Sequence, residues 1–167
     1  MNASNALRLR DAFLDRRCVS AWLGYGDVLF LGLGEDVLPV PGTGEGPASP
    51  PFKLNTNFAA WRVDGEVSAA WTDSDSGSNR TQLKAAAESL VGERVIGWEL
   101  LERMGLRLTF TAAKVLTVEP WPIEDGISDA WCIGSPDGRI LAVATDGRVV
   151  VVDMHLPVRD WFDPGPR

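Results

Sequence analysis

The chain has 167 residues, of which 45% are hydrophobic and 23% are charged, a size and composition typical of one folded globular domain. A chain of this length buries roughly 70% of its unfolded surface and needs no framework of disulfides or metals. The formal net charge is −7, and three windows (18–52, 63–79 and 115–138) contain acids but no Lys or Arg. This pattern argues against nucleic acid as a partner, because phosphate binding depends on clustered cations.

The N-terminal part predicts a helix followed by a hairpin. Apolar residues at helical spacing, with a polar cap at Ser4 or Asn5, predict a helix over 4–16. The apolar runs 18–23 and 27–33 lie on either side of a Gly-Tyr-Gly sequence and are typical of two strands joined by a turn.

A loop, a second hairpin and a second helix follow. The segment 34–51 is rich in Pro and Gly and predicts a long loop. The runs 55–64 and 66–72 are predicted to pair through Asp64-Gly65, because this dipeptide favours a two-residue turn with positive φ. A helix over 79–91 is predicted next, with a glycine directly after it as the C-cap.

The C-terminal half shows the alternation of an antiparallel meander, and Leu106, Leu108 and Phe110 show it most clearly. Strands are predicted over 94–103, 106–111, 114–121, 131–135, 140–145 and 148–153. Helices that are separated from runs of strands predict an α+β fold, with a mainly antiparallel β-sheet of hairpins and a meander and two helices packed against it. We expect a single domain over 1–156 and a Pro-rich C-terminal tail over 157–167.

Side chains suited to nucleophilic, metal or cofactor chemistry are scarce. His155 is the only histidine, and a lone imidazole at the end of a strand is more often a surface residue than a general base. Cys18 and Cys132 lie in apolar runs without CxxC spacing, which predicts buried, unreactive thiols and no zinc site. The glycine-rich segments 32–36 and 42–46 lack the residues of a nucleotide-binding loop. We therefore expect no catalytic residue, no metal and no cofactor.

The residues ahead of the second predicted helix resemble a calcium loop in part. Asp73, Asp75 and Asn79 occupy the first, third and seventh positions of such a loop. The sixth position is Ser78, where the loop needs glycine, and the twelfth is Lys84, where it needs an acid. The sequence favours a segment that caps the helix N-terminus.

Tryptophans and uncompensated acids are the remaining candidates for binding. The chain has seven tryptophans, most of them in strand-like runs where core packing is the usual role, and Trp161 in the tail is the one best placed for exposure. Acids in cation-free windows would steer a basic protein toward the chain, although acidic loops also serve solubility. The candidate binding residues are Asp27, Glu35, Asp36, Asp73, Asp75 and Trp161.

Six short segments carry a family resemblance through their aromatic and turn residues. They are Gly24-Tyr25-Gly26-Asp27-Val28-Leu29-Phe30-Leu31, Ala60-Trp61-Arg62-Val63, Ser74-Asp75-Ser76, Leu106-Arg107-Leu108-Thr109-Phe110, Ala130-Trp131-Cys132-Ile133 and Pro136-Asp137-Gly138-Arg139. Their order, from about Cys18 to about Asp153, resembles a group of small bacterial proteins of unknown function. Small acidic proteins of this appearance are also similar to immunity-type partners that neutralise bacterial toxins. The resemblance implies a fold and transfers no site residue.

Three functions are compatible with these features. The favoured one is a non-catalytic protein-interaction domain of the toxin-immunity kind, with a basic protein as partner. The alternatives are a small-molecule-binding domain with a Trp-lined pocket, formed with the loop over 34–51, and a hydrolase that uses two carboxylates from Asp27, Asp73 and Asp75. With no signal peptide or membrane-spanning stretch, we expect a cytoplasmic protein that binds neither membrane nor nucleic acid. Exposed sheet edges make a homodimer one option.

Overall fold

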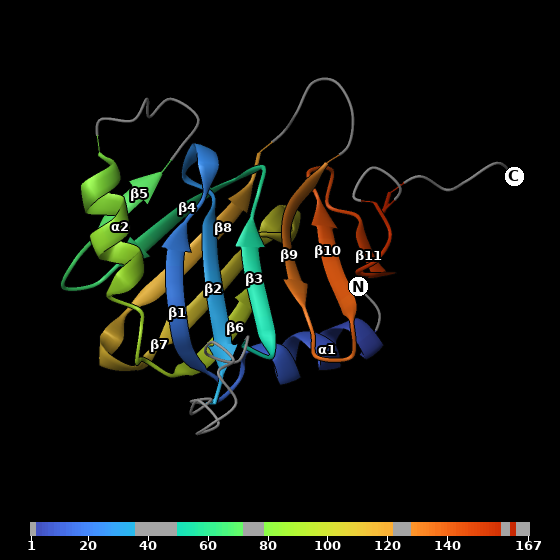
Figure 1. The fold of residues 1–167 in the computed structure, drawn as a ribbon, viewed down its shortest axis with the longest axis horizontal. Helices are drawn as coiled ribbons and strands as arrows, with labels where there is room; N and C mark the ends of the chain where they lie inside the picture. Colours follow the sequence, from blue (N-terminus) through green and yellow to red (C-terminus); the bar gives the residue numbers. More distant parts are fainter. Residues whose placement is uncertain (1–2, 36–49, 72–78, 122–127, 158–160, 163–167) are drawn as a thin grey trace, which may run out of the picture.

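The computed structural model describes residues 3–35, 50–71, 79–121, 128–157 and 161–162 and contains two antiparallel sheets and two α-helices (Figure 1). The six-stranded sheet has the order β1 (Arg17–Leu23), β2 (Leu29–Gly34), β3 (Phe52–Thr56), β9 (Asp129–Gly134), β10 (Arg139–Ala144) and β11 (Val149–Asp153). The five-stranded sheet has the order β5 (Ala69–Trp71), β4 (Ala59–Asp64), β8 (Val115–Pro120), β7 (Leu106–Phe110) and β6 (Val95–Leu100). The helices are α1 (Ala3–Phe13) and α2 (Arg80–Glu88), and three single-turn helices are η1 (Tyr25–Asp27), η2 (Glu102–Met104) and η3 (Thr111–Ala113). The predicted α+β class is confirmed.

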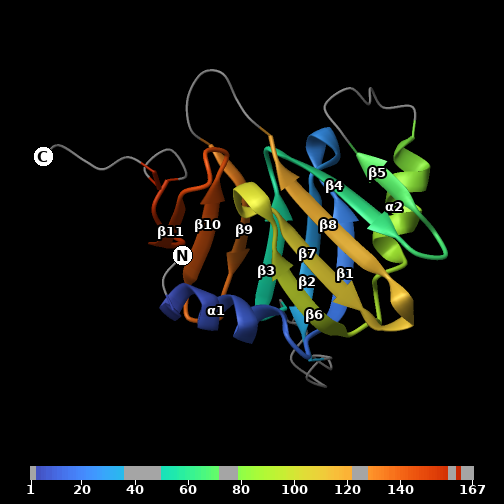
Figure 2. The same ribbon diagram turned by 180° about the vertical axis from the view of Figure 1, so that it is seen from behind.

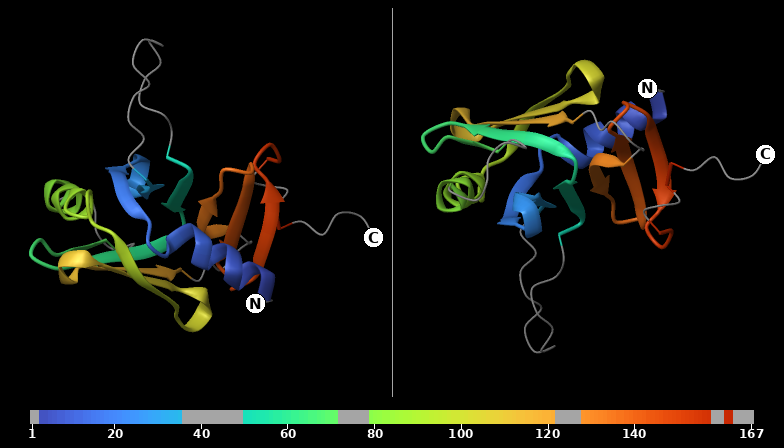
Figure 3. Two further views of the ribbon diagram at one scale, coloured as in Figure 1. Left: turned by 90° about the horizontal axis from the view of Figure 1, so that it is seen from below. Right: turned by 90° about the horizontal axis from the view of Figure 1, so that it is seen from above.

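The two sheets pack face to face, and each helix covers a different part of the space between them (Figure 3). Helix α2 lies at the end where the edge strands β1 and β5 meet and contacts both. Helix α1 lies under β9, β10 and β11, where Ala12, Ile133 and Leu141 line one small cavity of about 210 Å³. The five-stranded sheet and α1 together form the rear of the molecule (Figure 2). The outer face of the six-stranded sheet therefore carries neither helix and is turned toward the reader in Figure 1.

The chain passes from one sheet to the other between β3 and β4, where the sequence predicts one strand over 55–64. β3 ends at Thr56 and β4 begins at Ala59. The backbone amides of Asn57 and Phe58 donate instead to carbonyls of β9, at 2.8 and 3.3 Å. The single-strand prediction is wrong because the apolar alternation is the same on both sides of the break and does not show that the chain changes sheets.

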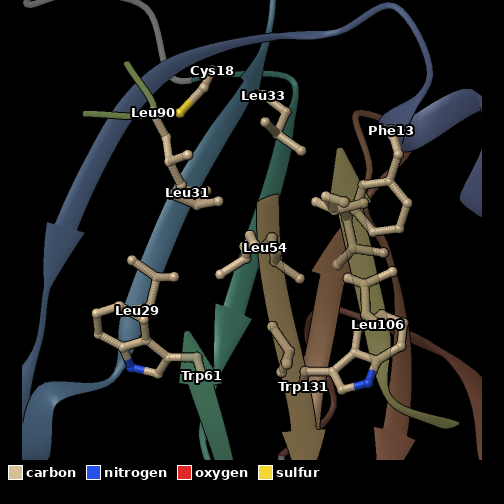
Figure 4. Packing of buried hydrophobic residues seen from close by; sticks show 14 of the residues in the cluster. Phe13, Cys18, Leu29, Leu31, Leu33, Leu54, Trp61, Leu90, Leu106 and Trp131 are labelled. Atoms are coloured by element: carbon tan, nitrogen blue, oxygen red, sulfur yellow. The ribbon is translucent and has the colours of Figure 1, made fainter. Parts of the chain in front are cut away.

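Leucines from both sheets fill the core, together with two fully buried tryptophans (Figure 4). Trp61 of β4 donates its Nε1–H to the Asp27 carbonyl in η1 at 2.9 Å, and Trp131 of β9 donates to the Met104 carbonyl in η2 at 2.8 Å. Turn η1 belongs to the six-stranded sheet and η2 to the five-stranded sheet. Each sheet thus supplies an indole that bonds to a turn of the opposite sheet. Burial of each large side chain contributes about 2 to 3 kcal/mol, and the two bonds fix how the sheets are aligned.

Two local predictions need correction. The hairpin of β4 and β5 forms, but Val63 pairs with Ala69, and neither residue of Asp64-Gly65 has the positive φ of a two-residue turn. Ser68 closes the longer connection, because its Oγ accepts from the Gly65 amide at 3.0 Å. The helix predicted over 4–16 ends at Phe13. Asp15 has a φ of 61°, and its amide donates to the Val95 carbonyl of β6 at 2.9 Å instead of continuing the helix.

The described part of the C-terminal tail packs on the outer face of β9 and β10. Trp161 is only 8% exposed and lies against Cys132 and Ala142, and its Nε1–H donates to the Leu156 carbonyl at 3.0 Å. The predicted exposure of Trp161 is therefore wrong. β10 and β11 carry apolar residues on both faces, and the small Ala142 side chain leaves room for an indole to cover them. Among the described residues, no helix combines the length and the apolar content that crossing a membrane would require.

Candidate functional site

Two exposed aromatic side chains and one half-buried one lie at one end of the six-stranded sheet, and we call Trp22, Tyr25 and Phe30 the aromatic surface. Trp22 of β1 is paired with Phe30 of β2 in the sheet register, and their rings stack at 4.0 Å between centroids with an angle of 4°. Trp22 is 53% exposed, and Tyr25, in the turn that joins the two strands, is 100% exposed. Large aromatics on a sheet face without cover are typical of binding surfaces rather than of cores.

Buried polar contacts hold the turn that carries Tyr25. The Asp27 carboxylate is nearly buried and pairs with the Arg80 guanidinium of α2. Arg80 Nη2 also donates to the carbonyls of Leu23 and Gly24, each at 3.2 Å. From the core side, Trp61 donates to the Asp27 carbonyl. The turn is thus bonded to a helix on one side and to the opposite sheet on the other, so Tyr25 projects from a fixed backbone.

Asp27 itself has a strained backbone. Its φ is 58°, in the left-handed region that costs about 1 kcal/mol for a residue with a side chain and that Asp and Asn tolerate best. Such strain persists only where the surrounding contacts determine the conformation. The ion pair with Arg80 and the bond from Trp61 are contacts of this kind.

Gly24 lets Phe30 lie close over the turn. A Cβ at this position would be 2.7 Å from Phe30 Cε2 and 3.5 Å from the ring of Trp22. Any side chain at position 24 would therefore push into the stacked pair. The aromatic surface depends on this glycine as well as on its own three rings.

The three described residues among those predicted to bind are not gathered in one place. Asp27 is held by Arg80, and Glu35 is exposed near Arg94, with 3.9 Å between Oε1 and Nη1. Trp161 packs on the sheet as described above. Asp36, Asp73 and Asp75 lie outside the described residues, and so does most of the predicted capping segment. A role in binding remains a prediction for all six.

The acids on which the prediction of a basic partner depends are unevenly distributed along the sequence. The segments outside the described residues contain eight acids and two basic residues in the sequence. The described residues are therefore nearly neutral, and most of the net charge of −7 belongs to those segments. Two of these acids, Asp73 and Asp75, precede Arg80 in the sequence, and Arg80 is the residue that holds the turn beside Tyr25.

Candidate catalytic groups do not assemble into a site within the described residues. His155 is exposed, as the sequence predicts, and its backbone amide donates to Asp153 Oδ1 at 2.9 Å. Burial raises the pKa of the Cys18 thiol to about 12, and burial also raises the pKa of Cys132. Both cysteines are free and buried, which confirms their predicted burial. No group of three His, Cys, Asp or Glu residues suited to a metal occurs among the described residues.

Asp129 is the one buried carboxylate without a cation beside it in the described structure. It is 3% exposed, at the start of β9, and Asn57 Nδ2 donates to its Oδ2. Burial raises its pKa, and the bond from Asn57 opposes that rise in part. Asn57 lies at the point where the chain leaves the six-stranded sheet, so this contact stabilises the change of sheet rather than a reaction.

The aromatic surface is the feature that sequence reasoning missed. Trp22 and Phe30 lie in apolar runs that resemble core strands, and nothing in their local pattern shows which face of the sheet remains uncovered. The Gly-Tyr-Gly sequence was the available signal, because a tyrosine between two glycines in a tight turn has little neighbouring bulk to bury it.

No protein-family model matches the chain, and no curated protein or solved structure shows significant similarity to it. A function for this chain therefore has to be inferred from its own residues.

Proposed function

We propose that this chain is a non-catalytic protein-interaction domain that binds a partner through the aromatic surface. The observation that carries the proposal is the exposure of Tyr25 and Trp22 on a turn and strand that buried contacts hold in place. Trp and Tyr are the residues that most often dominate binding energy at interfaces. A fixed backbone lowers the entropy that binding would otherwise cost.

A protein with a basic contact surface is the partner class that the net charge favours. A net charge of −7 attracts cationic proteins over roughly a Debye length, about 10 Å at 0.1 M salt. Electrostatic attraction of this kind raises the association rate, while the aromatic contacts set the lifetime of the complex. An immunity-type role, with a basic toxin as the partner, is the specific form of this proposal that the sequence suggests.

The test compares three versions of the protein as baits in an extract of the source cells at low salt. These are the wild type, the double variant Trp22→Ser with Tyr25→Ser, and the control Ile96→Ser, which alters an exposed residue of β6 on the other sheet. A genuine partner is retained by wild type and by the control and is lost with the double variant. The purified partner is then titrated against all three by calorimetry.

We expect the double variant to weaken binding at least about 100-fold, because each hot-spot aromatic contributes about 2 kcal/mol or more. The association rate should fall as salt rises. Circular dichroism must show the same folded state for the three proteins. Equal affinity of the double variant and the wild type for the purified partner would contradict the proposal. It would also be contradicted if the double variant captured every protein that the wild type captures.

A further inference from the structure

A groove of about 480 Å³ lies on the outer face of the six-stranded sheet beside the aromatic surface, over β3 and β9. We call it the outer groove. Asn55, Cys132 and Gly134 lie on its floor, Pro50 and Pro51 line one side, and Trp161 lines another. Its volume is within the range of about 300 to 1,000 Å³ that is usual for small-molecule sites.

A glycine leaves open space at the floor of the groove. Gly134 is paired with Lys53 on one side and with Ile140 on the other, and a Cβ built on it would meet no atom closer than 4.0 Å. Its φ is not in the left-handed region. The backbone at position 134 thus accepts a Cβ without a clash, and the missing side chain leaves open space over the strand.

The charges that line the outer groove are all positive. Lys53 and Arg139 are its only charged lining residues in the described structure. Neither side chain has an ion-pair partner within the described ranges, whereas most other cations there are paired with acids. Asp137, close by in sequence, instead faces Arg8 of α1, with 3.5 Å between Oδ2 and Nη1. Arg139 alternates with Ile140 along β10, so its side chain lies on the Leu141 side of the sheet, and it also lines the small cavity under α1. Lys53, on the same face as Gly134, is therefore the cation of the outer face, and within the described ranges it has no acid beside it, which points to an anionic ligand.

The neutral lining residues specify the rest of the ligand. The Asn55 Oδ1 accepts from the Cys132 thiol, which leaves the amide N–H groups of Asn55 as donors. Phe30, the two prolines, Ile140 and Trp161 supply flat or apolar contact area. Amide donors and a cation at one part of the groove, with aromatic and proline surfaces at another, match a molecule that has an oxyanion on a planar apolar body.

We propose that the outer groove binds a small aromatic carboxylate of about two rings, with the carboxylate at Lys53 and the Asn55 amide and the ring system over Gly134 and against Trp161. This proposal does not depend on the protein-interaction function. The groove and the aromatic surface share Phe30 but differ in every other residue named for them. A ligand here would be small and soluble, and its body would be buried between Pro50–Pro51 and Trp161.

The test uses 2-naphthoate and its uncharged analogue 2-naphthamide as probes, titrated into the full chain by calorimetry and by two-dimensional NMR. We expect saturable binding of 2-naphthoate to the wild type, at least about 10-fold tighter than that of 2-naphthamide, because the amide cannot form the charge-assisted bonds. Lys53→Met should weaken naphthoate binding at least about 5-fold and leave the naphthamide affinity unchanged. Lys84→Met, which removes an exposed lysine of α2, is the matched control and should bind like wild type.

Gly134→Val tests the space in the groove. Valine favours a strand and meets no clash at this position, so the variant should fold and unfold like the wild type while it loses binding of both probes. Trp22→Ser with Tyr25→Ser should bind 2-naphthoate normally, so a failure of the protein-interaction proposal can be told apart from a failure of this one. Equal affinity for the two probes, naphthoate binding unchanged in Gly134→Val, or no saturable binding to the wild type would overturn the proposal.

Discussion

Replacement of Arg80 by Met should lower the free energy of unfolding by about 2 kcal/mol, although Arg80 lies on the surface. Its guanidinium bonds to the Asp27 carboxylate and to two backbone carbonyls of the turn before β2. A hydrogen bond to a charged group contributes about 1.5 to 3 kcal/mol. The Arg80 side chain is 51% exposed, so solvent screens part of this, whereas the Asp27 carboxylate is only 9% exposed and would lose its cation.

The assay is urea unfolding followed by far-ultraviolet circular dichroism. For a domain of this size, a loss of about 2 kcal/mol also lowers the melting temperature by about 6 °C. Lys84→Met is the matched control on the same helix, because the Lys84–Glu88 pair is exposed on both sides and should contribute less than about 0.5 kcal/mol.

A double-mutant cycle separates the ion pair from the other contacts of Arg80. Asp27→Asn keeps the shape of the side chain and tolerates the φ of 58°, so it removes mainly the charge. We expect a coupling energy of about 1 kcal/mol between positions 27 and 80. An Arg80→Met variant that unfolds at the same urea concentration as Lys84→Met would refute the view that α2 anchors the turn.

Three further outcomes follow from buried groups. Burial raises the pKa of Asp129, so the native state holds this proton to higher pH than the unfolded state does. The free energy of unfolding should therefore fall as pH rises from about 4 toward the raised pKa and then level off. Urea titrations of Asp129→Asn should lack this part of the pH dependence. Iodoacetamide at pH 8 should label Cys18 and Cys132 only after unfolding, as seen by mass spectrometry, since burial raises both pKa values; rapid labelling of the native protein would contradict their burial. Trp61→Phe and Trp131→Phe should each lower the free energy of unfolding by about 2 kcal/mol because a buried carbonyl loses its donor. Only Trp61→Phe should also weaken partner binding, since its acceptor lies in the turn that carries Tyr25. Equal effects of the two variants on binding would contradict the view that the Trp61 bond positions this turn.

The sequence predicts the fold class because antiparallel strands leave a direct trace in it. Leu106, Leu108 and Phe110 alternate with polar residues, and the structure buries all three in β7. The assignment of strands to two sheets leaves no such trace, because the amides at positions 57 and 58 change partners without any change in the apolar pattern. Alternation shows that a strand has two faces, but it does not show which face water reaches.

The candidate site could not be predicted for the same reason. Trp22 and Phe30 occupy the same cross-strand row as Cys132 and Ala142, through the register of β1, β2, β3, β9 and β10. The indole of Trp161 covers one end of this row and leaves the other end open. That difference depends on the contact of Trp161 with Ala142 and Cys132, which lie 19 and 29 residues earlier in the sequence, and no local pattern encodes it.

The row also shows why the open end is available for binding. Trp22 and Phe30 shield each other by stacking, yet about half of Trp22 and all of Tyr25 remain in water. These two side chains bury about 150 to 250 Å² each when fully covered, and apolar burial contributes about 25 cal/mol per Å². Covering these exposed rings would therefore contribute several kcal/mol of burial free energy that folding alone does not provide. Because Arg80 and Trp61 already hold the turn in place, a partner that covers these rings gains that free energy with little further ordering of this chain.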